Sequence, residues 1–246
     1  MLVSIMPSRA ATQANKRAAL VTGGAVRVGR AIALALADLG MDVAIGYHGS
    51  AFEARRTVRA IEARGVRAIA LPVDLRHPAA AQRVVKTAAT QLGRLDVLVN
   101  SAAVFRRVPF PTVTAETYDE FLDVNLRGAF FCSQAAARVM ARRGGHIVNL
   151  GDAAIARPMP GFIAYAISKA GLEAMTKHLA SALRPKNIAV NAVAPGPVLR
   201  PKGYPLDRWK KLTRNRTVTL EDVTAAVTFL ATCPKSITGQ TLSVDG

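Results

Sequence analysis

The chain has 246 residues, half of them hydrophobic, and a formal net charge of +17. The hydrophobic share is enough to bury a sizeable core, and no apolar run reaches the roughly 18 residues that a membrane span needs. The positive charge is compatible with an anionic substrate or cofactor, with nucleic-acid binding, or with a generally basic surface. Because no run of cations exceeds two residues and aromatic residues are not interleaved with them, we favour a solvated basic surface. We therefore expect neither nucleic acid nor membrane as a partner.

The two cysteines, Cys132 and Cys233, have neither metal-ligand spacing nor the pattern of a disulfide framework. This cysteine usage suits a reducing cytosol, so we predict a cytoplasmic protein without a metal site. The opening Met1–Met6 stretch is too short for the apolar region of a secretory signal, and it is followed by Ser, Arg and Gln, so we expect residues 1–16 to form a flexible extension. Residues 17–246 contain no repeat or linker and are predicted to form a single domain.

Short apolar runs alternate with longer amphipathic runs along this domain. The predicted strands, in chain order, are Ala18–Thr22, Asp42–Tyr47, Val66–Val73, Leu95–Asn100, Gly145–Leu150, Ile188–Ala194 and Thr241–Val244. The predicted helices are Val28–Leu39, Ala51–Arg64, Pro78–Gln91, one long helix from Ala115 to Arg143, Phe162–Leu183 and Leu220–Ala231. Alternation of this kind predicts an α/β fold, with a doubly wound, Rossmann-like parallel sheet of about seven strands and helices on both faces. Ligands of such sheets bind beyond the carboxyl ends of the strands.

The end of the first strand indicates a nucleotide site. The segment Thr22–Gly29 reads TGGAVRVG and opens a helix. Glycines let the backbone turn sharply and approach a pyrophosphate, and the helix N-terminus offers unpaired N–H groups. We predict that Gly23, Arg27, Val28 and Gly29 contact the cofactor.

The second and third strands indicate which dinucleotide is bound. An NAD site usually has an acid at the end of the second strand, whereas this strand ends with Tyr47 and His48, followed by Ser50. With Arg27 nearby, a cation and polar groups favour a 2′-phosphate, so we predict NADP(H). Asp74 follows the third strand, where it is positioned either to bind the adenine edge or to cap the next helix.

Tyr165 and Lys169 are four residues apart in a predicted helix and therefore share one face. Free tyrosine titrates near 10, and a nearby ammonium stabilises the phenolate and lowers the pKa. This pairing predicts an acid–base site with Tyr165 as the proton donor.

Together these motifs resemble the short-chain dehydrogenase/reductase family over about residues 17–246. Further matching residues are Asn100 and Ala102 after the fourth strand, Asn125, and Pro195 with Gly196 after the sixth strand. The resemblance implies that Tyr165 is the general acid, that Lys169 tunes it and holds the nicotinamide ribose, and that Asn125 keeps a water in the proton relay. It also implies a homo-oligomer, a tetramer, with the two longest predicted helices supplying the larger interface.

One departure from the family pattern narrows the expected substrate. The family usually has a serine thirteen residues before the tyrosine, where this chain has Asp152. With Arg27 in the glycine turn and the aromatic Phe105, this is similar to pteridine reductases and dihydromonapterin reductases. The similarity implies an Asp152–Tyr165–Lys169 triad and a pterin-like substrate that contacts Phe105, Asp152 and Tyr165. A second departure is Gly49, which replaces the subgroup's usual second-strand arginine.

We thus expect an NADPH-dependent reductase of a pterin-like C=N bond. The alternative within the family is a carbonyl reductase acting on a 3-oxoacyl thioester or a small ketone. A nucleotide-sensing, nucleic-acid-binding protein is disfavoured, because a sensor has no need of the proton relay formed by Tyr165, Lys169 and Asn125.

Overall fold

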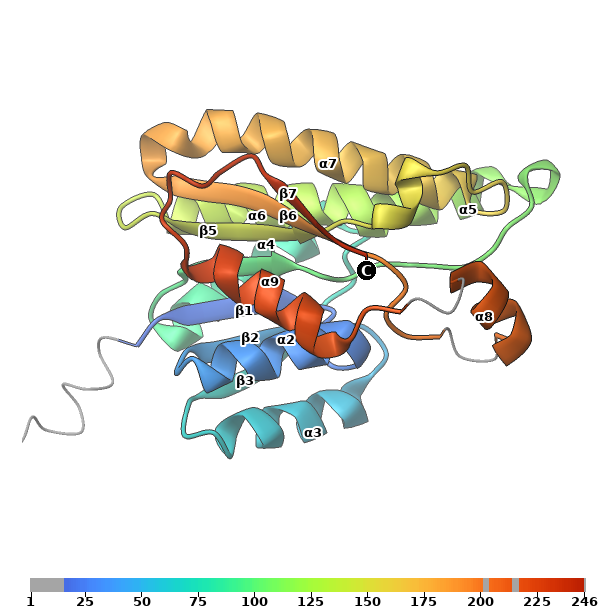
Figure 1. The fold of residues 1–246 in the computed structure, drawn as a ribbon. Coiled ribbons are helices and arrows are strands. Elements are labelled where there is room, and N and C mark those ends of the chain that lie inside the picture. The colour runs from blue at the N-terminus through green and yellow to red at the C-terminus, as the bar shows by residue number, and fades with distance from the viewer. Residues whose placement is uncertain (1–15, 201–203, 214–216, 246) are drawn as a thin grey trace, which may run out of the picture.

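The computed structural model describes residues 16–200, 204–213 and 217–245 (Figure 1). Seven parallel strands form one sheet in the order β3-β2-β1-β4-β5-β6-β7. The strands are β1 (Ala18–Thr22), β2 (Asp42–Tyr47), β3 (Ala68–Pro72), β4 (Val97–Asn100), β5 (Gly145–Leu150), β6 (Ile188–Pro195) and β7 (Thr241–Val244). The predicted doubly wound α/β sheet is confirmed. The strand order reverses between β1 and β4, which is where sheets of this kind bind their ligands.

Helices cover both faces of the sheet. They are α2 (Arg27–Asp38), α3 (Ala51–Glu62), α4 (Pro78–Leu92), α5 (Ala115–Leu122), α6 (Ala129–Val139), α7 (Ile163–Leu183), α8 (Leu206–Thr213) and α9 (Leu220–Thr232). One core packs α2, α3 and α9 on the sheet, and the other packs α4, α6 and α7 on the opposite face. Successive strand residues point to opposite faces, so the two cores take alternate positions, as Leu20 and Val21 of β1 do. Burial on both faces explains why the central strands read as continuous apolar runs.

The long helix predicted from Ala115 to Arg143 is wrong in detail. The chain forms α5, then a π-helical turn over Asp123–Gly128, then α6, which ends at Val139. Gly128 passes so close to Leu75 that a Cβ there would lie 2.9 Å from the Leu75 Cβ. The wider turn also directs the Asn125 side chain inward to Val104 and Ser168. These are tertiary contacts, and π turns of this kind often occur at functional sites.

Smaller differences concern element ends. Strands β3 and β4 each start two residues later than predicted, and β6 continues through Pro195. Helix α8 was not predicted at all. Of the expected N-terminal extension, residues 1–15 lie outside the described part of the chain. In the three ranges that the structure describes, no helix is both long and apolar enough to cross a membrane.

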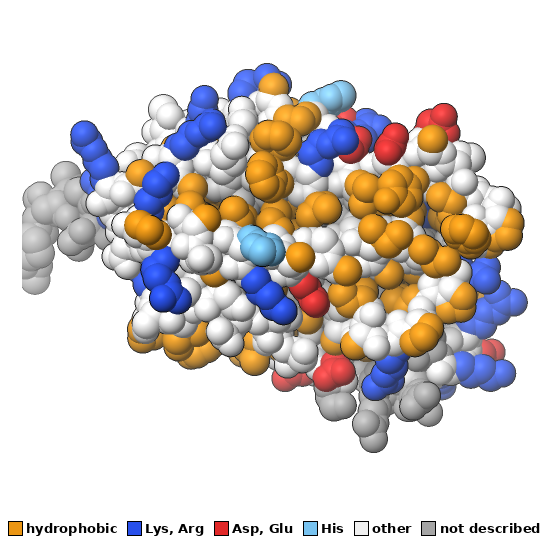
Figure 2. Space-filling model, turned by 90° about the horizontal axis from the view of Figure 1, so that it is seen from above, with side chains coloured by type: hydrophobic (Ala, Val, Ile, Leu, Met, Phe, Trp, Pro, Cys, Tyr) orange, Lys and Arg blue, Asp and Glu red, His pale blue; other side chains and the backbone are white. Residues whose placement is uncertain are grey.

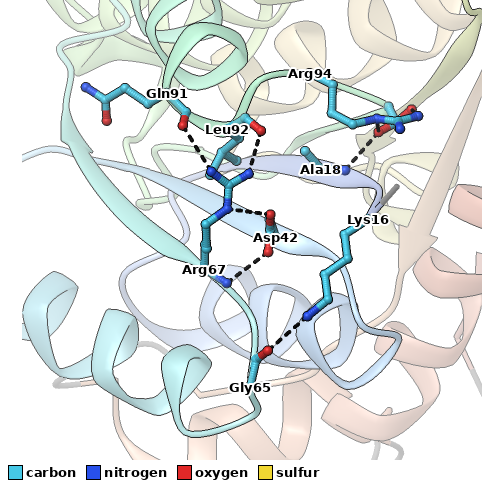
Figure 3. Close-up of polar contacts among 9 residues, drawn as sticks. Lys16, Ala18, Asp42, Gly65, Arg67, Gln91, Leu92 and Arg94 are labelled. Atoms are coloured by element: carbon cyan, nitrogen blue, oxygen red, sulfur yellow. Dashed lines mark hydrogen bonds and ion pairs between the residues drawn. The ribbon is translucent and has the colours of Figure 1, made fainter. Parts of the chain in front are cut away.

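The amino edge of the sheet, opposite the carboxyl ends of the strands, is held by charged groups that find partners within the chain (Figure 3). The Arg67 guanidinium donates to the Asp42 carboxylate at 2.8 Å and to the Leu92 carbonyl at 2.6 Å. The Asp96 carboxylate accepts from the Ala18 amide and from Arg94, at 2.8 and 2.7 Å. These contacts tie the starts of the strands together.

Candidate active site

A cavity of about 780 Å³ opens at the carboxyl ends of the strands, at the point where the strand order reverses. It brings together residues from the glycine turn, from the ends of β2 to β6 and from α7. Most residues predicted from the sequence line it: Gly23, Arg27, Val28, Gly29, Tyr47, His48, Ser50, Asp74, Ala102, Phe105, Asp152, Tyr165, Lys169, Pro195 and Gly196. One end of the cavity is thus formed by the glycine turn and the other by Tyr165 and its neighbours.

The glycine turn leaves no room for side chains. Gly23 has a φ of +65°, and a Cβ on it would lie 2.8 Å from the Ala102 Cα. A Cβ on Gly29 would lie 2.2 Å from the Gly23 carbonyl oxygen. Helix α2 follows directly, and its N-cap residue, Val26, makes no side-chain capping hydrogen bond. A bare backbone loop before a helix N-terminus that no side chain caps fits a pyrophosphate.

Arg27, His48 and Ser50 form the polar part of the cofactor end, and β2 ends without an acid. Two potential cations and a hydroxyl fit a 2′-phosphate, which a carboxylate would repel. The Arg27 side chain also reaches across the cavity and donates to the Leu199 carbonyl at 3.0 Å. Its position therefore belongs both to the cofactor end and to the segment that follows β6.

Asp74 makes a contact that neither sequence hypothesis predicted. Arg76 donates to both oxygens of the Asp74 carboxylate, with Nη2 to Oδ2 at 2.6 Å and Nε to Oδ1 at 3.0 Å. This guanidinium is the main reason that the pKa of Asp74 falls to about 2. The capping alternative is wrong, because the N-cap of α4 is His77 and no side chain caps that helix. Asp74 remains on the cavity wall, with its carboxylate bound by Arg76.

The other end of the cavity is built around Tyr165, which the buried face of α7 places against the end of β5. The Tyr165 hydroxyl donates to Oδ2 of Asp152 at 2.5 Å. Oδ1 of Asp152 accepts from the Ala154 amide at 2.8 Å, so a short 3₁₀ turn fixes the carboxylate orientation. Burial and the adjacent Asp152 carboxylate raise the pKa of Tyr165 well above its usual value. Tyr165 is therefore held in its protonated form.

Lys169 lies one helical turn after Tyr165 and is buried at the cavity wall. Burial lowers the pKa of its ammonium to about 8, and Asp152 opposes this shift. Its Nζ donates to the Leu150 carbonyl at 2.6 Å and lies 5.9 Å from the centre of the Tyr165 ring. The expected lowering of the Tyr165 pKa by Lys169 is not seen in this arrangement, because burial and Asp152 dominate. The sequence predicted that Asp152, Tyr165 and Lys169 lie together, but not that burial and Asp152 would outweigh the effect of the ammonium on the Tyr165 pKa.

Phe105 contacts two aromatic rings at the substrate end. It stacks on Phe162 with ring centres 4.9 Å apart and meets the Tyr165 ring edge-on at 4.8 Å. One face of Phe105 is thus covered by Phe162, yet 39% of the residue remains exposed. Phe162 was not predicted as a site residue, although its position three residues before Tyr165 is a usable signal, since such residues share a helix face.

Asn100 and Asn125 lie beneath the cavity and do not line it. Nδ2 of Asn100 donates to Oδ1 of Asn149 at 2.8 Å. Oδ1 of Asn125 accepts from the Val104 amide, and its Nδ2 donates to the Val104 carbonyl and to Ser168. The Asn100 side chain is therefore engaged within the chain, and its contact with the cofactor stays a prediction. The Asn125 side chain anchors the loop that carries Phe105, and any part in a proton relay falls to its backbone.

Several wall residues were not assigned to the site from the sequence. The substrate end includes Met159 from the loop before α7, Val198 and Leu199 after β6, and Trp209 on α8. These apolar side chains come from loops and a short helix with no strong periodicity, so only the fold reveals that they converge. Within the described residues, no group of three His, Cys, Asp or Glu side chains is placed to hold a metal ion.

Comparisons with known proteins agree with this geometry. A family model described as enoyl-(acyl carrier protein) reductase matches residues 24–246. The 3-oxoacyl-[acyl-carrier-protein] reductase FabG of Staphylococcus aureus is 37% identical over 238 residues, covering 94% of this chain and 97% of the relative. The corresponding reductase of Synechocystis is 35% identical over 243 residues, covering 96% of this chain and 98% of the relative.

Two solved structures with the same fold are complexes with NADP or NADPH. A short-chain dehydrogenase from Burkholderia cenocepacia in complex with NADP is 40% identical, with a TM-score of 0.87 and 94% and 96% of the two chains covered. A blue fluorescent protein from a metagenomic library in complex with NADPH is 36% identical, with a TM-score of 0.88 and 95% and 98% covered. These matches span nearly the whole chain, and the chain belongs to the short-chain dehydrogenase/reductase family.

Proposed function

We propose that the chain is an NADPH-dependent reductase whose hydride acceptor is a C=N bond in a small, flat nitrogen heterocycle of the pterin kind. The observation that carries this proposal is the hydrogen bond from Tyr165 to Asp152 at the substrate end of the cavity. NADPH would supply the hydride. The glycine turn, Arg27, His48 and Ser50 support this cofactor by their fit to a dinucleotide with a 2′-phosphate, as do the structural neighbours that contain NADP and NADPH.

Asp152 favours a substrate that carries N–H groups. An ionised carboxylate only accepts hydrogen bonds, so it pairs well with the ring N–H and amino groups of a pterin. It pairs poorly with a ketone oxygen, which also only accepts. Tyr165, held protonated by burial and by Asp152, is the donor for the ring nitrogen of the acceptor bond. After this transfer, the Lys169 ammonium, whose Nζ lies 5.9 Å from the centre of the Tyr165 ring, is positioned to return a proton to the tyrosine.

The second candidate is reduction of the C=O bond of a 3-oxoacyl thioester or a small ketone. The named relatives favour this candidate over the pterin prediction, since both of those reported from Staphylococcus aureus and Synechocystis are 3-oxoacyl-[acyl-carrier-protein] reductases. Tyr165 and Lys169 serve this reaction equally well. Asp152 does not, because it takes the place of a hydroxyl that would donate to the carbonyl oxygen.

The variant Asp152→Ser separates the two candidates. A serine hydroxyl can donate to a carbonyl oxygen, but it lacks the carboxylate that accepts from the N–H groups of a pterin and that orients the Tyr165 hydroxyl. For a pterin substrate, we expect turnover to fall by about 10²- to 10⁴-fold, because proton transfer from Tyr165 loses the group that aligns it. For a ketone, turnover should stay the same or rise. NADPH affinity, measured by fluorescence titration, serves as the control and should hardly change, because residue 152 lies at the substrate end.

We further propose that the chain forms a homo-oligomer, a tetramer as the family resemblance implies. Large exposed hydrophobic side chains lie on the neighbouring helices α6 and α7: Phe130, Val139 and Ile167. Figure 2, which looks down on the α7 side of the molecule, shows hydrophobic side chains gathered between scattered charges. Large apolar side chains that gather on one exposed face are typical of an interface. Light scattering at micromolar concentration should give about four times the 26.0 kDa chain mass, and a monomer would refute the proposal.

A further inference from the structure

Residues 197–200, which follow β6, form part of the substrate wall and are here called the cover segment. We propose that Arg27 is a positioning residue that holds this segment in place, a role separate from any contact with the cofactor. The inference requires that the family's hydride-transfer chemistry operates in this cavity, but it does not depend on which substrate is reduced.

The contact is a guanidinium fork on two successive backbone carbonyls. Nη2 of Arg27 donates to the Leu199 carbonyl at 3.0 Å and to the Arg200 carbonyl at 3.4 Å, and Nη1 also reaches the Arg200 carbonyl at 3.4 Å. The two partners lie more than 170 positions apart in the sequence. Arg27 therefore joins the first βα turn to the segment after the sixth strand, across the mouth of the cavity.

Other described residues anchor the cover segment at its start. The Gly196 amide donates to the Val244 carbonyl at 2.7 Å, and the Val218 amide donates to the Pro197 carbonyl at 3.0 Å. Val198 and Leu199 then line the cavity. At the far end, the Arg27 guanidinium ties the segment to the first βα turn, and Nη1 of Arg200 donates to the Tyr204 carbonyl at 2.5 Å. Without Arg27, the wall formed by Val198 and Leu199 would depend on the anchor at Pro197 and on this local contact of Arg200.

The backbone at Arg27 supports a specific role for its side chain. Its φ of +52° lies in the left-handed region, which only glycine adopts without cost. A glycine at this position would relieve this backbone strain. Strained residues that persist in this way cluster at functional sites. The sequence nevertheless has arginine here, and its side chain has two hydrogen-bond acceptors, the carbonyls of Leu199 and Arg200.

An arginine suits two tasks at one position. Its guanidinium has five N–H groups in a planar fork, and the contacts to Leu199 and Arg200 use only those on Nη1 and Nη2. The same group can therefore face a phosphate on one side while it holds the cover segment on the other. Recognition of the cofactor and the shape of the substrate wall would then be coupled through one side chain.

The test uses NADH as the cofactor, because NADH has no 2′-phosphate and so removes the first task of Arg27. Steady-state kinetics would compare the parent protein with Arg27→Ala, using a substrate that the parent turns over. We expect the KM of the substrate to rise about ten-fold or more, since hydrogen bonds from a charged donor are lost. The KM of NADH should hardly change, which separates this effect from damage to the cofactor site.

Two further variants make the comparison sharper. Arg27→Lys keeps the charge but loses the fork, so it should keep much of the preference for NADPH while its substrate KM rises as in Arg27→Ala. Arg30→Ala is the matched control, because Arg30 is an exposed arginine on the same helix that does not line the cavity. Its substrate KM should equal that of the parent.

A second readout needs no turnover. Trp209 is the only tryptophan of the chain, and it lines the same cavity. In cofactor-free protein, Arg27→Ala should shift Trp209 emission to longer wavelength and speed its quenching by acrylamide, whereas Arg30→Ala should do neither. If the parent reduces no substrate that is tried, the fluorescence of Trp209 alone tests the proposed role of Arg27. The inference is overturned if Arg27→Ala leaves the substrate KM with NADH within about two-fold of the parent, or, where nothing is turned over, if Trp209 behaves as in the parent.

Discussion

The two edges of the sheet use charged groups in opposite ways. At the amino edge, Asp42 pairs with Arg67 and Asp96 pairs with Arg94 (Figure 3), so each carboxylate is bound within the chain. At the carboxyl edge, Asp152 and the groups around it face a cavity of about 780 Å³. The first edge ties strands together, and the second presents polar groups to a ligand.

Perturbed pKa values occur at both edges and do not by themselves distinguish them. Burial lowers the pKa of Lys169 to about 8 at the carboxyl edge and that of His146 to about 4 at the amino edge. Lys169 lines the cavity, whereas His146 is enclosed within β5. A shifted pKa therefore indicates chemistry only where the group also reaches a space that a substrate can enter. The comparison predicts that changes at the carboxyl edge alter turnover and that changes at the amino edge alter stability.

The largest effect is expected at the carboxyl edge from Tyr165→Phe. This variant removes the proton donor and keeps the ring that packs on Phe105 and Phe121. The kcat should fall by about 10²- to 10⁴-fold, whichever substrate is used. Thermal unfolding and NADPH titration serve as controls and should resemble the parent. A variant with more than a tenth of the parent kcat would remove Tyr165 from the role of general acid.

At the amino edge, His146 should make stability depend on pH. Burial and the nearby cations Arg17 and Lys235 lower its folded-state pKa from 6.5 to about 4. Between pH 6.5 and about 4, His146 binds a proton in the unfolded chain but stays neutral in the folded chain. The free energy of unfolding therefore decreases as the pH falls through this range. The loss should approach roughly 3 kcal/mol.

Urea unfolding at several pH values, for the parent and for His146→Gln, measures this contribution. Carboxylates also titrate in acid, so the difference between the two proteins is the relevant quantity. The parent should lose more stability than the variant between pH 7 and pH 5, while kcat at pH 7 should be similar in both. Equal slopes would show that His146 does not act in this way.

The smallest of these effects concerns the cofactor end of the carboxyl edge. Arg27→Ala should weaken NADPH binding by about ten- to hundred-fold, because one charge-assisted contact to the 2′-phosphate is lost. NADH binding should change little. Isothermal titration with both cofactors checks this prediction, and equal losses would exclude Arg27 as the group that recognises the 2′-phosphate.

The parts of the fold that sequence could predict are those set by local pattern. Apolar runs located all seven strands, and glycine spacing located the turn at Gly23 and Gly29, because few residues tolerate such backbone geometry. The spacing of Tyr165 and Lys169 placed both on one face of α7, as the structure confirms.

What sequence could not predict depends on contacts between distant segments. The π turn around Asn125 follows from the approach of Gly128 to Leu75. The ring of Phe162 on Phe105 and the carbonyls that Arg27 binds belong to loops whose meeting only the fold determines. The ion pair between Arg76 and Asp74 could not be predicted either, because no periodic pattern specifies the direction of a side chain in a loop.

The central claim is that the Asp152 carboxylate, hydrogen-bonded to Tyr165, selects a C=N substrate. The most direct measurement is NADPH oxidation by the parent and by Asp152→Ser, each with an oxidised pterin and with an acetoacetyl thioester. We expect the parent to have the higher kcat/KM for the pterin, and Asp152→Ser to lose about 10²- to 10⁴-fold of it while thioester reduction persists or rises. A parent that reduces the thioester well and does not reduce the pterin would contradict the claim and leave carbonyl reduction as the function.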